Sequence, residues 1–294
     1  MQALAVNFKQ VDVFTSTPFK GNPVAVILDA RGLSTAQMQA IANWTNLSET
    51  TFVLPAENSE ADYRVRIFTP KSELPFAGHP TIGTAWALLE AGRVVPHEGH
   101  LIQECGAGLV RLTLTLGHNG ETSIAFDLPK PHITELSPEQ IDAIEEMIGC
   151  KISRSLCPAL VDVGAKWIVA QLSDASSVLN VTPDYARLRQ HDLAMAITGI
   201  CLYGDYPQQE EMTIEVRSFA PACGVNEDPV CGSGNGSVAA FIRYHGKELS
   251  MPLQVKASQG QALGREGKVS LIIDHDIIKV GGCAVTCIDG QINL

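Results

Sequence analysis

The chain has 294 residues, of which 45% are hydrophobic and 18% are charged, and its formal net charge is −11. This composition is that of a globular protein with enough apolar residues to bury sizeable cores. The negative charge would repel a phosphate backbone, so we expect no nucleic-acid partner, and the sequence contains no apolar run of membrane-spanning length.

The first half of the chain is predicted to alternate strands with two helices. "QVDVFTSTPFKGNPVAVIL" (10–28) indicates a strand, a turn and a second strand, because apolar residues alternate on both sides of a Pro- and Gly-containing turn. Ser34 and Gln37 form a capping-box signature for a helix in "STAQMQAIANWTN". Strands are expected in "SETTFVLPA" and "ADYRVRIFTP", followed by a helix from about Pro80 to Glu90 and by strands in "LIQECGAGLVRLTLTLG" and "ETSIAFDLP".

The second half repeats this order. The Pro-rich segment "PKPHITELSPEQ" (129–140) has no regular pattern, so we place a domain boundary there, and Ser137 with Gln140 predicts a helix that ends at Gly149. "LVDVGAKWIVAQL" echoes the opening strand pair, and "LQVKASQGQALGREGKVSLIID" echoes the strands that close the first half. We therefore expect two domains, residues 1–129 and 130–281, with the last strand, about 282–294, returning to the first domain.

The repeat is supported by constant spacing. Three residues of "ELPFAGHPTIG" recur in "EDPVCGSGNG" 154 positions later: Glu73 as Glu227, Pro75 as Pro229 and Gly78 as Gly232. Arg66 and Pro70 recur 151 positions later as Arg217 and Pro221, whereas Gly83 is replaced by Ser237. This order favours two domains related by internal pseudo-symmetry over the alternative that any two β-turn-α units look alike.

Both repeated turns place small residues at the start of an apolar helix. Helix N-termini present N–H groups and a partial positive charge, which makes them suitable for binding anions. If the two domains face each other across a pseudo-twofold axis, both helix starts point into one cleft that would hold a small carboxylate. A single glycine-rich helix start is common and would not justify this prediction alone. The predicted substrate-binding residues are Gly78, Cys231, Gly232 and Gly234.

No cofactor or metal is expected. "GSGNGS" does not fit a dinucleotide fingerprint, because Pro229 rather than a strand precedes it. The nearest candidate for the ribose-binding acid, Glu248, comes before the next strand-like segment instead of after it. The sequence contains no cluster of Cys, His and carboxylate residues at metal-ligand spacing.

Glu49 is an unusual residue for its place in "NLSETTFVL". A carboxylate that enters a β-strand from a helix–strand connection fits secondary-structure preferences poorly, which suggests a cleft-facing acid/base. The alternative is an ordinary glutamate at the edge of a strand. Three further polar residues, His79, Asp228 and Ser233, lie at the repeated turns and complete the set of candidate catalytic residues.

Five segments together resemble the PhzF-like isomerase family: "VDVFTSTPFKGNPVAVIL", "NLSETTFVL", "RIFTPKSELPFAGHPTIGTAWAL", "EDPVCGSGNGS" and "GQALGREGKV". The resemblance covers nearly the whole chain in the same order. It implies an α/β (α+β) fold like that of diaminopimelate epimerase, with two domains that are each a curled, mostly antiparallel sheet around a central helix. It also implies cofactor-independent isomerisation of a small carboxylate-bearing substrate, with Glu49 as acid/base assisted by His79, Asp228 and Ser233.

Cys231 departs from the family pattern, which usually has threonine at this position. "CGSG" resembles the thiol-bearing turn of diaminopimelate epimerase, but the symmetry mate of Cys231 is Ala77, so a two-thiol mechanism cannot operate. Two alternatives to the isomerase stay open. One is an amino-acid-type epimerase or racemase that uses Glu49 and Cys231, and the other is a non-catalytic small-molecule binding protein.

The expected location is the cytoplasm. The first residues lack the basic start and apolar core of a signal peptide, and the eight cysteines include no C-x-x-C pair, so free thiols are expected. The expected partner is a small-molecule carboxylate substrate, and a homodimer is the assembly that we consider.

Overall fold

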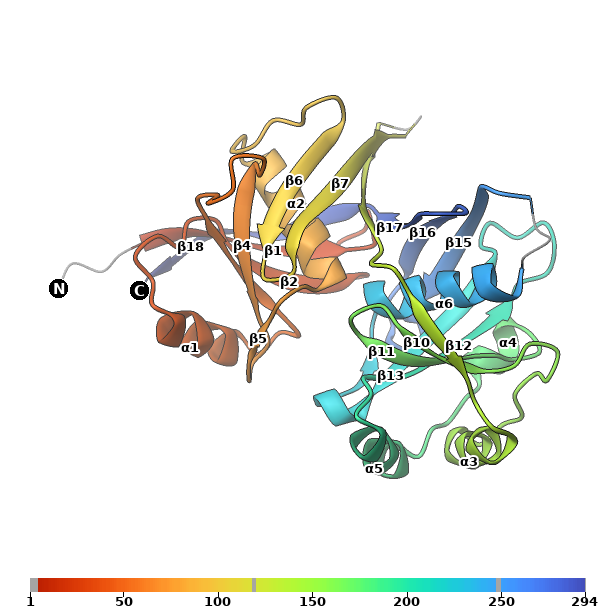
Figure 1. Ribbon diagram of the computed structural model, residues 1–294. Helices are drawn as coiled ribbons and strands as arrows, with labels where there is room; N and C mark the ends of the chain where they lie inside the picture. Colours follow the sequence, from red (N-terminus) through yellow and green to blue (C-terminus); the bar gives the residue numbers. More distant parts are fainter. Residues whose placement is uncertain (1–4, 118–119, 247–249, 294) are drawn as a thin grey trace. The chain divides into compact units, whose positions relative to one another are not determined.

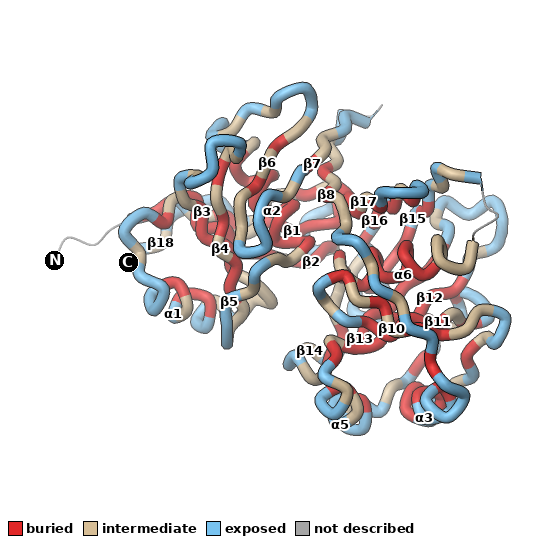
Figure 2. The backbone as a smooth tube through the Cα atoms, in the orientation of Figure 1, coloured by how far each residue is buried: buried red, intermediate tan, exposed pale blue. Residues whose placement is uncertain are grey.

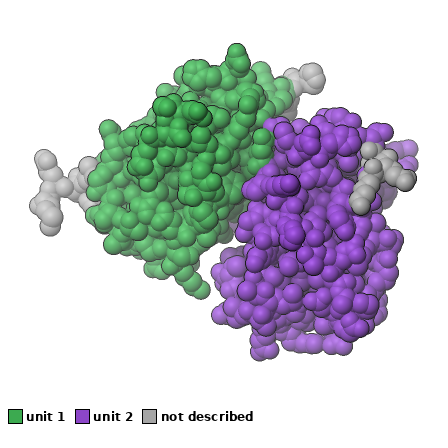
Figure 3. Space-filling view, viewed as in Figure 1, with its two compact units in different colours: residues 1–127, 281–294 green, residues 128–280 purple. Residues whose placement is uncertain are grey.

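The computed structural model describes residues 5–117, 120–246 and 250–293. The chain divides into two compact units: unit 1 contains residues 1–127 and 281–294, and unit 2 contains residues 128–280 (Figure 3). Among the helices that the structure describes, none is long and apolar enough to cross a membrane.

Unit 1 is a curled sheet around one helix (Figure 1). Its elements are β1 (Ala5–Val13), β2 (Asn22–Ile27), α1 (Thr35–Thr45), β3 (Thr50–Leu54), β4 (Tyr63–Phe68), β5 (Glu73–Leu74), α2 (Gly78–Glu90), β6 (His100–Cys105), β7 (Gly108–Leu116), β8 (Thr122–Asp127) and β18 (Ala284–Asn293). The strand order is β18-β1-β2-β3-β4-β6-β7-β8, and the pairs β2–β3 and β4–β6 are parallel. Because α2 contacts β18 and β8 at the two ends of this order as well as β1, β2 and β3, the sheet curls around it.

Unit 2 has the same plan. Its elements are β9 (His132–Glu135), α3 (Pro138–Ile148), β10 (Ala159–Asp162), β11 (Lys166–Gln171), α4 (Ala175–Leu179), α5 (Tyr185–Met195), β12 (Gly199–Asp205), β13 (Ile214–Ala220), η1 (Pro221–Cys223), β14 (Val225–Asp228), α6 (Gly232–His245), β15 (Leu253–Gln259), η2 (Gln261–Leu263), β16 (Gly267–Ile273) and β17 (Ile278–Gly282). The strand order is β9-β10-β11-β12-β13-β15-β16-β17. The parallel pairs are β11–β12 and β13–β15, and α6 contacts β10, β11, β12 and β16.

The two strand orders match element by element, which confirms the predicted pseudo-symmetric fold. The outermost strand of each sheet follows the other unit in sequence. β9 comes after β8 of unit 1 but pairs with β10, and β18 comes after β17 but pairs with β1. Each half of the chain therefore gives its last strand to the sheet of the other half.

A side-chain arrangement repeats with the fold. In unit 1, Arg66 donates from Nε and Nη2 to the two carboxylate oxygens of Glu73 at 2.7 and 2.6 Å. In unit 2, Arg217 donates in the same way to Glu227, at 2.8 Å for both bonds. We call each bidentate pair an Arg–Glu fork. Both guanidinium groups also lie over a ring two residues along the same strand, Phe68 at 5.1 Å and Phe219 at 4.9 Å.

Local capping signals give most helix boundaries. The capping boxes predicted at Ser34–Gln37 and Ser137–Gln140 are both present, and α3 ends before Gly149 as expected. α2 begins at Gly78, two residues before the predicted start.

The prediction that residues 129–140 lack regular structure was wrong, because β9 lies between the two prolines and the α3 cap and pairs with β10. A strand preceding the turn at Pro229 was also missed, since the four-residue β14 ends at Asp228. Glu248 lies outside the described residues.

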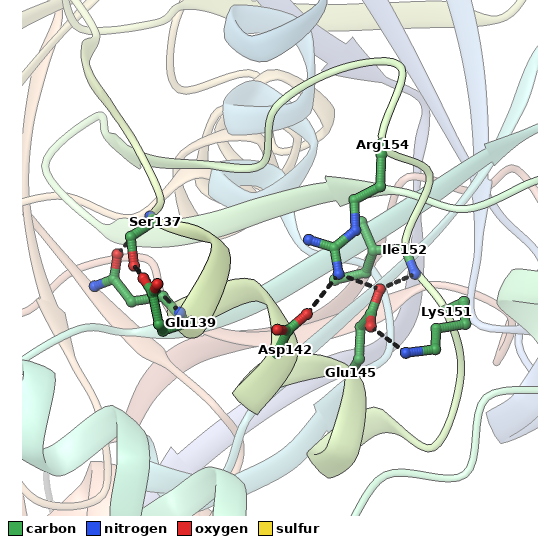
Figure 4. A network of polar contacts seen from close by, with 8 residues as sticks. Ser137, Glu139, Asp142, Glu145, Lys151, Ile152 and Arg154 are labelled. Atoms are coloured by element: carbon green, nitrogen blue, oxygen red, sulfur yellow. Dashed lines mark hydrogen bonds and ion pairs between the residues drawn. The ribbon is translucent and has the colours of Figure 1, made fainter.

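Each sheet buries its outer face under helices. In unit 2, apolar residues of α3, α4 and α5 pack on β11 and β12 with Phe219, and in unit 1 α1 packs on Ile27, Phe52 and Phe68. Glu145 of α3, which is 5% exposed, accepts from Ile152 N at 3.0 Å and from Lys151 Nζ at 2.7 Å (Figure 4). The central helices α2 and α6 are buried over most of their length (Figure 2).

Gly83 and Ser237 are equivalent positions at which the two repeats have different steric requirements. A Cβ atom at Gly83 would lie 2.4 Å from Val24 Cγ1 and 3.0 Å from Val13 Cγ2, so Gly83→Ala is expected to lower the free energy of unfolding by about 1–3 kcal/mol. Ser237 Oγ is buried and has no hydrogen-bond partner among the described residues. Ser237→Ala should therefore leave stability unchanged or raise it by up to about 1 kcal/mol. Urea unfolding of both variants measures the difference, and a loss at Ser237 as large as at Gly83 would contradict this account.

Candidate active site

Glu49 lies in the short connection between α1 and β3. α1 ends at Asn46, which adopts the left-handed conformation, and the Glu49 carbonyl accepts a hydrogen bond from Ala25 N at 3.4 Å. These contacts fix the backbone at the position where the carboxylate enters the sheet. The Glu49 side chain is 16% exposed, and its Oε2 lies 3.3 Å from Nε2 of His79, the second residue of α2.

His79 is held as a neutral imidazole. Burial lowers the pKa of His79 to about 3, and a hydrogen bond to the backbone of Pro23 offsets this only in part. Proline has no N–H, so the acceptor is its carbonyl and the histidine ring is the donor. Nε2 has no hydrogen-bond partner among the described residues, so Nδ1 makes the bond to Pro23. The proton is therefore on Nδ1, and the Nε2 atom that faces Glu49 carries a lone pair.

The equivalent turn of unit 2 gathers Asp228, Cys231 and Ser233. Asp228 Oδ1 accepts from Val230 N at 3.1 Å, and the carboxylate also forms a hydrogen bond with the Cys231 side chain. Burial raises the pKa of Asp228 to about 6, and the neighbouring Glu227 adds to the increase. Burial, together with Asp228, also raises the pKa of the Cys231 thiol well above its usual range. At neutral pH Cys231 is a neutral thiol, which can donate a proton but is a poor base.

Three residues that the sequence did not single out support this turn. The Gln259 side chain accepts from Cys231 N at 3.1 Å and donates to the Asp228 carbonyl at 2.9 Å. Asn235 donates to the Cys231 carbonyl at 2.9 Å and to Gln259 Oε1 at 2.7 Å. The indole of Trp167 donates to Ser233 Oγ at 3.0 Å, and Ser233 Oγ also lies 3.6 Å from Cys231 Sγ.

The helices that start at the two turns differ from the others in their caps. α1, α3, α4 and α5 are each capped by a side-chain oxygen, from Ser34, Ser137, Asp174 and Asp184. The N-cap of α2 is Ala77, with no side-chain hydrogen bond from any residue that the structure describes. The N-cap of α6 is Cys231, whose sulfur accepts from Gly234 N at 3.3 Å, a weaker acceptor than oxygen. A carboxylate is a suitable additional partner for the first turn of such helices.

The glycines at these turns have different reasons to be glycine. A Cβ atom at Gly234 would lie 2.6 Å from Ser218 Oγ and 2.7 Å from Cys201 Sγ, so this position is set by close packing of α6 on β12 and β13. Gly78 and Gly232 are the first residues of α2 and α6, where their backbone N–H groups face the entry of each helix.

The structure thus brings the predicted residues together in two groups. Glu49, His79 and Gly78 form the group in unit 1, and Asp228, Cys231, Gly232, Ser233 and Gly234 form the group in unit 2. Asn235 could have been found, because it lies inside the quoted "GSGNGS". The Pro23 carbonyl could not, since a backbone acceptor leaves no side-chain signal.

His79 and Asp228 are expected to change stability with pH in opposite directions. The pKa of His79 is about 3 in the folded chain against an ordinary 6.5, so its stabilising contribution is complete above pH 6.5 and is lost as the pH falls towards 3. The pKa of Asp228 is raised from 3.8 to about 6, so its contribution is complete below pH 3.8 and is lost as the pH rises through 6.

Substitution at each position separates the two effects. Between about pH 4 and pH 6, the stability advantage of the parent protein over His79→Asn should grow with rising pH by up to about 1.4 kcal/mol per unit. The advantage over Asp228→Asn should shrink over the same range. Urea unfolding across this range measures both slopes, and a His79→Asn variant that follows the parent at every pH would refute the neutral buried histidine.

The chain is similar in sequence to a known protein family and to curated proteins along most of its length. A family model described as "Phenazine biosynthesis-like protein" matches residues 11–290. "Antisense-enhancing sequence 1" of Schizosaccharomyces pombe is 44% identical over 293 residues, which cover 97% of this chain and 98% of that protein. The trans-2,3-dihydro-3-hydroxyanthranilate isomerase of Pseudomonas fluorescens is 36% identical over 262 residues, covering 88% of this chain and 87% of that enzyme.

Solved structures agree on the fold. The crystal structure of the Bacillus anthracis phenazine biosynthesis protein of the PhzF family superposes with a TM-score of 0.88 at 26% identity, covering 99% of this chain and 100% of that chain. A probable proline racemase from Agrobacterium radiobacter has a TM-score of 0.68 at 17% identity, covering 98% of this chain and 93% of that chain. The second likeness extends the fold to racemases and carries no statement about activity.

Proposed function

The chain belongs to the phenazine biosynthesis-like protein family, and we propose that it is a cofactor-independent isomerase that moves a proton within a small carboxylate-bearing substrate. The observation that carries this proposal is the contact of 3.3 Å between Glu49 Oε2 and the unprotonated Nε2 of a buried, neutral His79. A carboxylate beside a neutral hydrogen-bond acceptor suits a group that must hold a proton for part of a catalytic cycle.

In the proposed cycle, Glu49 first accepts a proton from a carbon atom of the substrate. The electron pair left behind is delocalised through the unsaturated system next to the substrate carboxylate. Glu49, now a neutral carboxylic acid, can donate its proton as a hydrogen bond to Nε2 of His79. It then returns the proton to a different carbon atom, which completes the isomerisation with no net change in protons or electrons.

The tautomer of His79 is what makes this cycle reversible. With its proton held on Nδ1 by the Pro23 carbonyl, the imidazole accepts a hydrogen bond from Glu49 but does not take the proton away, because burial disfavours the imidazolium. General acid–base groups of this kind typically contribute about 10²- to 10⁴-fold to a rate.

The turn of unit 2 also carries groups suited to a carboxylate-bearing substrate. The first turn of α2 or of α6 would hold the substrate carboxylate, since neither helix has an oxygen side chain as its cap. Asp228, with a pKa of about 6, is suited to exchange protons with a polar substituent of the substrate near neutral pH. Ser233, whose oxygen accepts from Trp167, would turn its hydroxyl proton from the long contact with Cys231 Sγ to the substrate.

The experiment that tests the proposal uses trans-2,3-dihydro-3-hydroxyanthranilate as the first candidate substrate, incubated with the protein in D₂O. An isomerase is expected to give a product with deuterium on a carbon different from the one that lost its proton. A chelator in the same assay tests the proposed independence from metals, and activity restored only by one added metal would contradict it.

The same labelling separates the alternatives. An epimerase or racemase that uses Glu49 and Cys231 would place deuterium on the original carbon, and a binding protein would incorporate none. The high pKa of Cys231 disfavours the two-base alternative, because a thiol that stays protonated cannot take the proton in the reverse direction. Cys231→Thr should therefore leave an isomerase largely active, whereas a Glu/Cys racemase would lose exchange on one face.

The proposal also includes a cytoplasmic homodimer. All eight cysteines are free, which suits a reducing compartment. Cell fractionation and light scattering of the purified protein test the two parts separately.

A further inference from the structure

We infer that the Arg217–Glu227 fork is a positioning device for the candidate active-site turn of unit 2, acting on Asp228 and the start of α6 from the opposite face of the sheet. This inference rests on the proposed function only in treating Asp228 as an active group.

Strand geometry places the fork directly behind the site. Asp228 pairs with Ser218 across β13 and β14, and successive residues of a strand point to opposite faces. Ser218 therefore faces α6, where its Oγ lies 3.2 Å from Cys201 Sγ, while its neighbour Arg217 faces the outer layer. Glu227 bonds to Arg217 and therefore lies on the same outer face, although the register of β13 and β14 shifts between Ser218 and Ala220. Arg217 directly precedes Ser218, and Glu227 directly precedes Asp228. The fork therefore joins the two residues next to the Ser218–Asp228 pair.

The fork is itself held rigidly. The Arg217 and Glu227 side chains are 6% and 4% exposed, and Arg217 Nη1 also donates to the carbonyls of Val178, Leu179 and Val181 at the end of α4. Tyr185 of α5 forms a hydrogen bond with Glu227. The two bonds of the fork and the bond to Tyr185 leave Glu227 little freedom, and three further bonds hold Arg217, so the residue after Glu227 is fixed as well.

The fork of unit 1 provides an internal comparison. Glu73 lies five residues before Gly78, as Glu227 lies five before Gly232, but the Arg66 and Glu73 side chains are 20% and 40% exposed. The same element has therefore been buried only in the unit whose turn carries a carboxylate directly after the glutamate.

The test measures the turn directly and needs no substrate, so it stands whether or not the proposed reaction is correct. Glu227→Gln removes the charge, and Glu227→Asp keeps the charge but shortens the side chain. Glu73→Gln and Glu73→Asp are the matched controls. The readouts are the titration of the Asp228 carboxyl carbon by NMR and amide hydrogen exchange at Val230 and Gly234, whose N–H groups bond Asp228 Oδ1 and Cys231 Sγ.

Glu227→Gln should lower the midpoint of the Asp228 carboxyl titration by about one pH unit, because a like charge is removed and the Arg217 charge is left unpaired. The other titratable groups near Asp228 are Cys231 and Cys201, and Glu215 lies near Arg217. All variants retain these groups, so a difference between variants in the Asp228 titration comes from the substituted residue. Both Glu227 variants should speed exchange at Val230 and Gly234 by about tenfold relative to the rest of unit 2. If Glu227→Gln does not fold, Glu227→Asp carries the test.

Three results would overturn the inference. Folded Glu227 variants with unchanged exchange at Val230 and Gly234 would show that the fork does not hold the turn. A uniform increase in exchange across unit 2 would show a purely structural role. Equal changes at these amides in the Glu73 controls would show that the effect does not come from the fork behind Asp228.

Discussion

Glu49→Gln is expected to remove turnover while leaving the fold intact. Glutamine keeps the shape of the side chain and an oxygen that can accept hydrogen bonds, but its amide cannot take a proton at neutral pH. The loss should be at least about 10²- to 10⁴-fold, the usual contribution of a general acid–base group. Glu49 lies in the connection between α1 and β3, and glutamine can keep its contact with His79. The temperature of thermal unfolding should therefore change little.

The measurement is the rate of deuterium transfer with a confirmed substrate, next to a thermal melt of the same preparation. Glu60→Gln is the matched control, because Glu60 is an exposed glutamate in the same unit, and it should keep the parent rate. A well-folded Glu49→Gln protein that retains the parent rate within a few-fold would remove Glu49 from the mechanism.

The two Arg–Glu forks should differ strongly in their importance for stability. Replacing either Arg217 or Glu227 by alanine leaves a buried charge without its partner, which typically costs about 3–5 kcal/mol. Arg217→Ala also removes the donor to three carbonyls at and just after the end of α4, so it should be the worse of the two. Arg66→Ala and Glu73→Ala break a pair of the same geometry that is open to water, where the cost is about 0–1 kcal/mol.

Urea unfolding of the four alanine variants makes this comparison within one protein. Each fork has the same two bidentate bonds and stacks on a phenylalanine, but Arg217 also bonds three carbonyls. The two glutamate variants therefore give the closer comparison of a buried with an exposed fork. Similar losses at the two forks would mean that burial does not set their contribution.

Much of the fold follows from signals that are local in the sequence. The Ser34 and Ser137 capping boxes and the alternating apolar residues of β1 and β2 each identify an element without reference to the rest of the chain. The repeat needed a comparison of the two halves, in which Glu73 recurs as Glu227. β9 could not be recognised in this way. It has four residues, of which only Ile133 is apolar, and it is a strand because β10 offers it a partner.

The candidate site shows the same division. Glu49 could be selected from the sequence because a carboxylate at the start of a strand conflicts with local preference. The neutral state of His79 could not be, since it arises from burial and from the Pro23 carbonyl, which are brought together only by the fold. The contrast between a buried and an exposed fork is also invisible in the sequence, where Arg66 and Arg217 look alike.

The exchange of terminal strands has a consequence for synthesis on the ribosome. Unit 2 is one continuous stretch of chain and can fold as soon as it has emerged, whereas β1 must wait for β18 at the far end of the chain. At about 5–20 residues per second, the first unit remains unfinished for roughly ten to thirty seconds after its own residues are made. During that interval the edge of β1 is open to pairing with other chains. Lys9 lies on this strand. Its partner Glu90 of α2, at 2.8 Å, is made early, whereas its other partner, Asp289 of β18 at 2.6 Å, is made only with β18. Until β18 is made, the positive charge of Lys9 on the open edge disfavours pairing of β1 with other chains. In the folded unit, the same lysine holds β1 to β18 through Asp289.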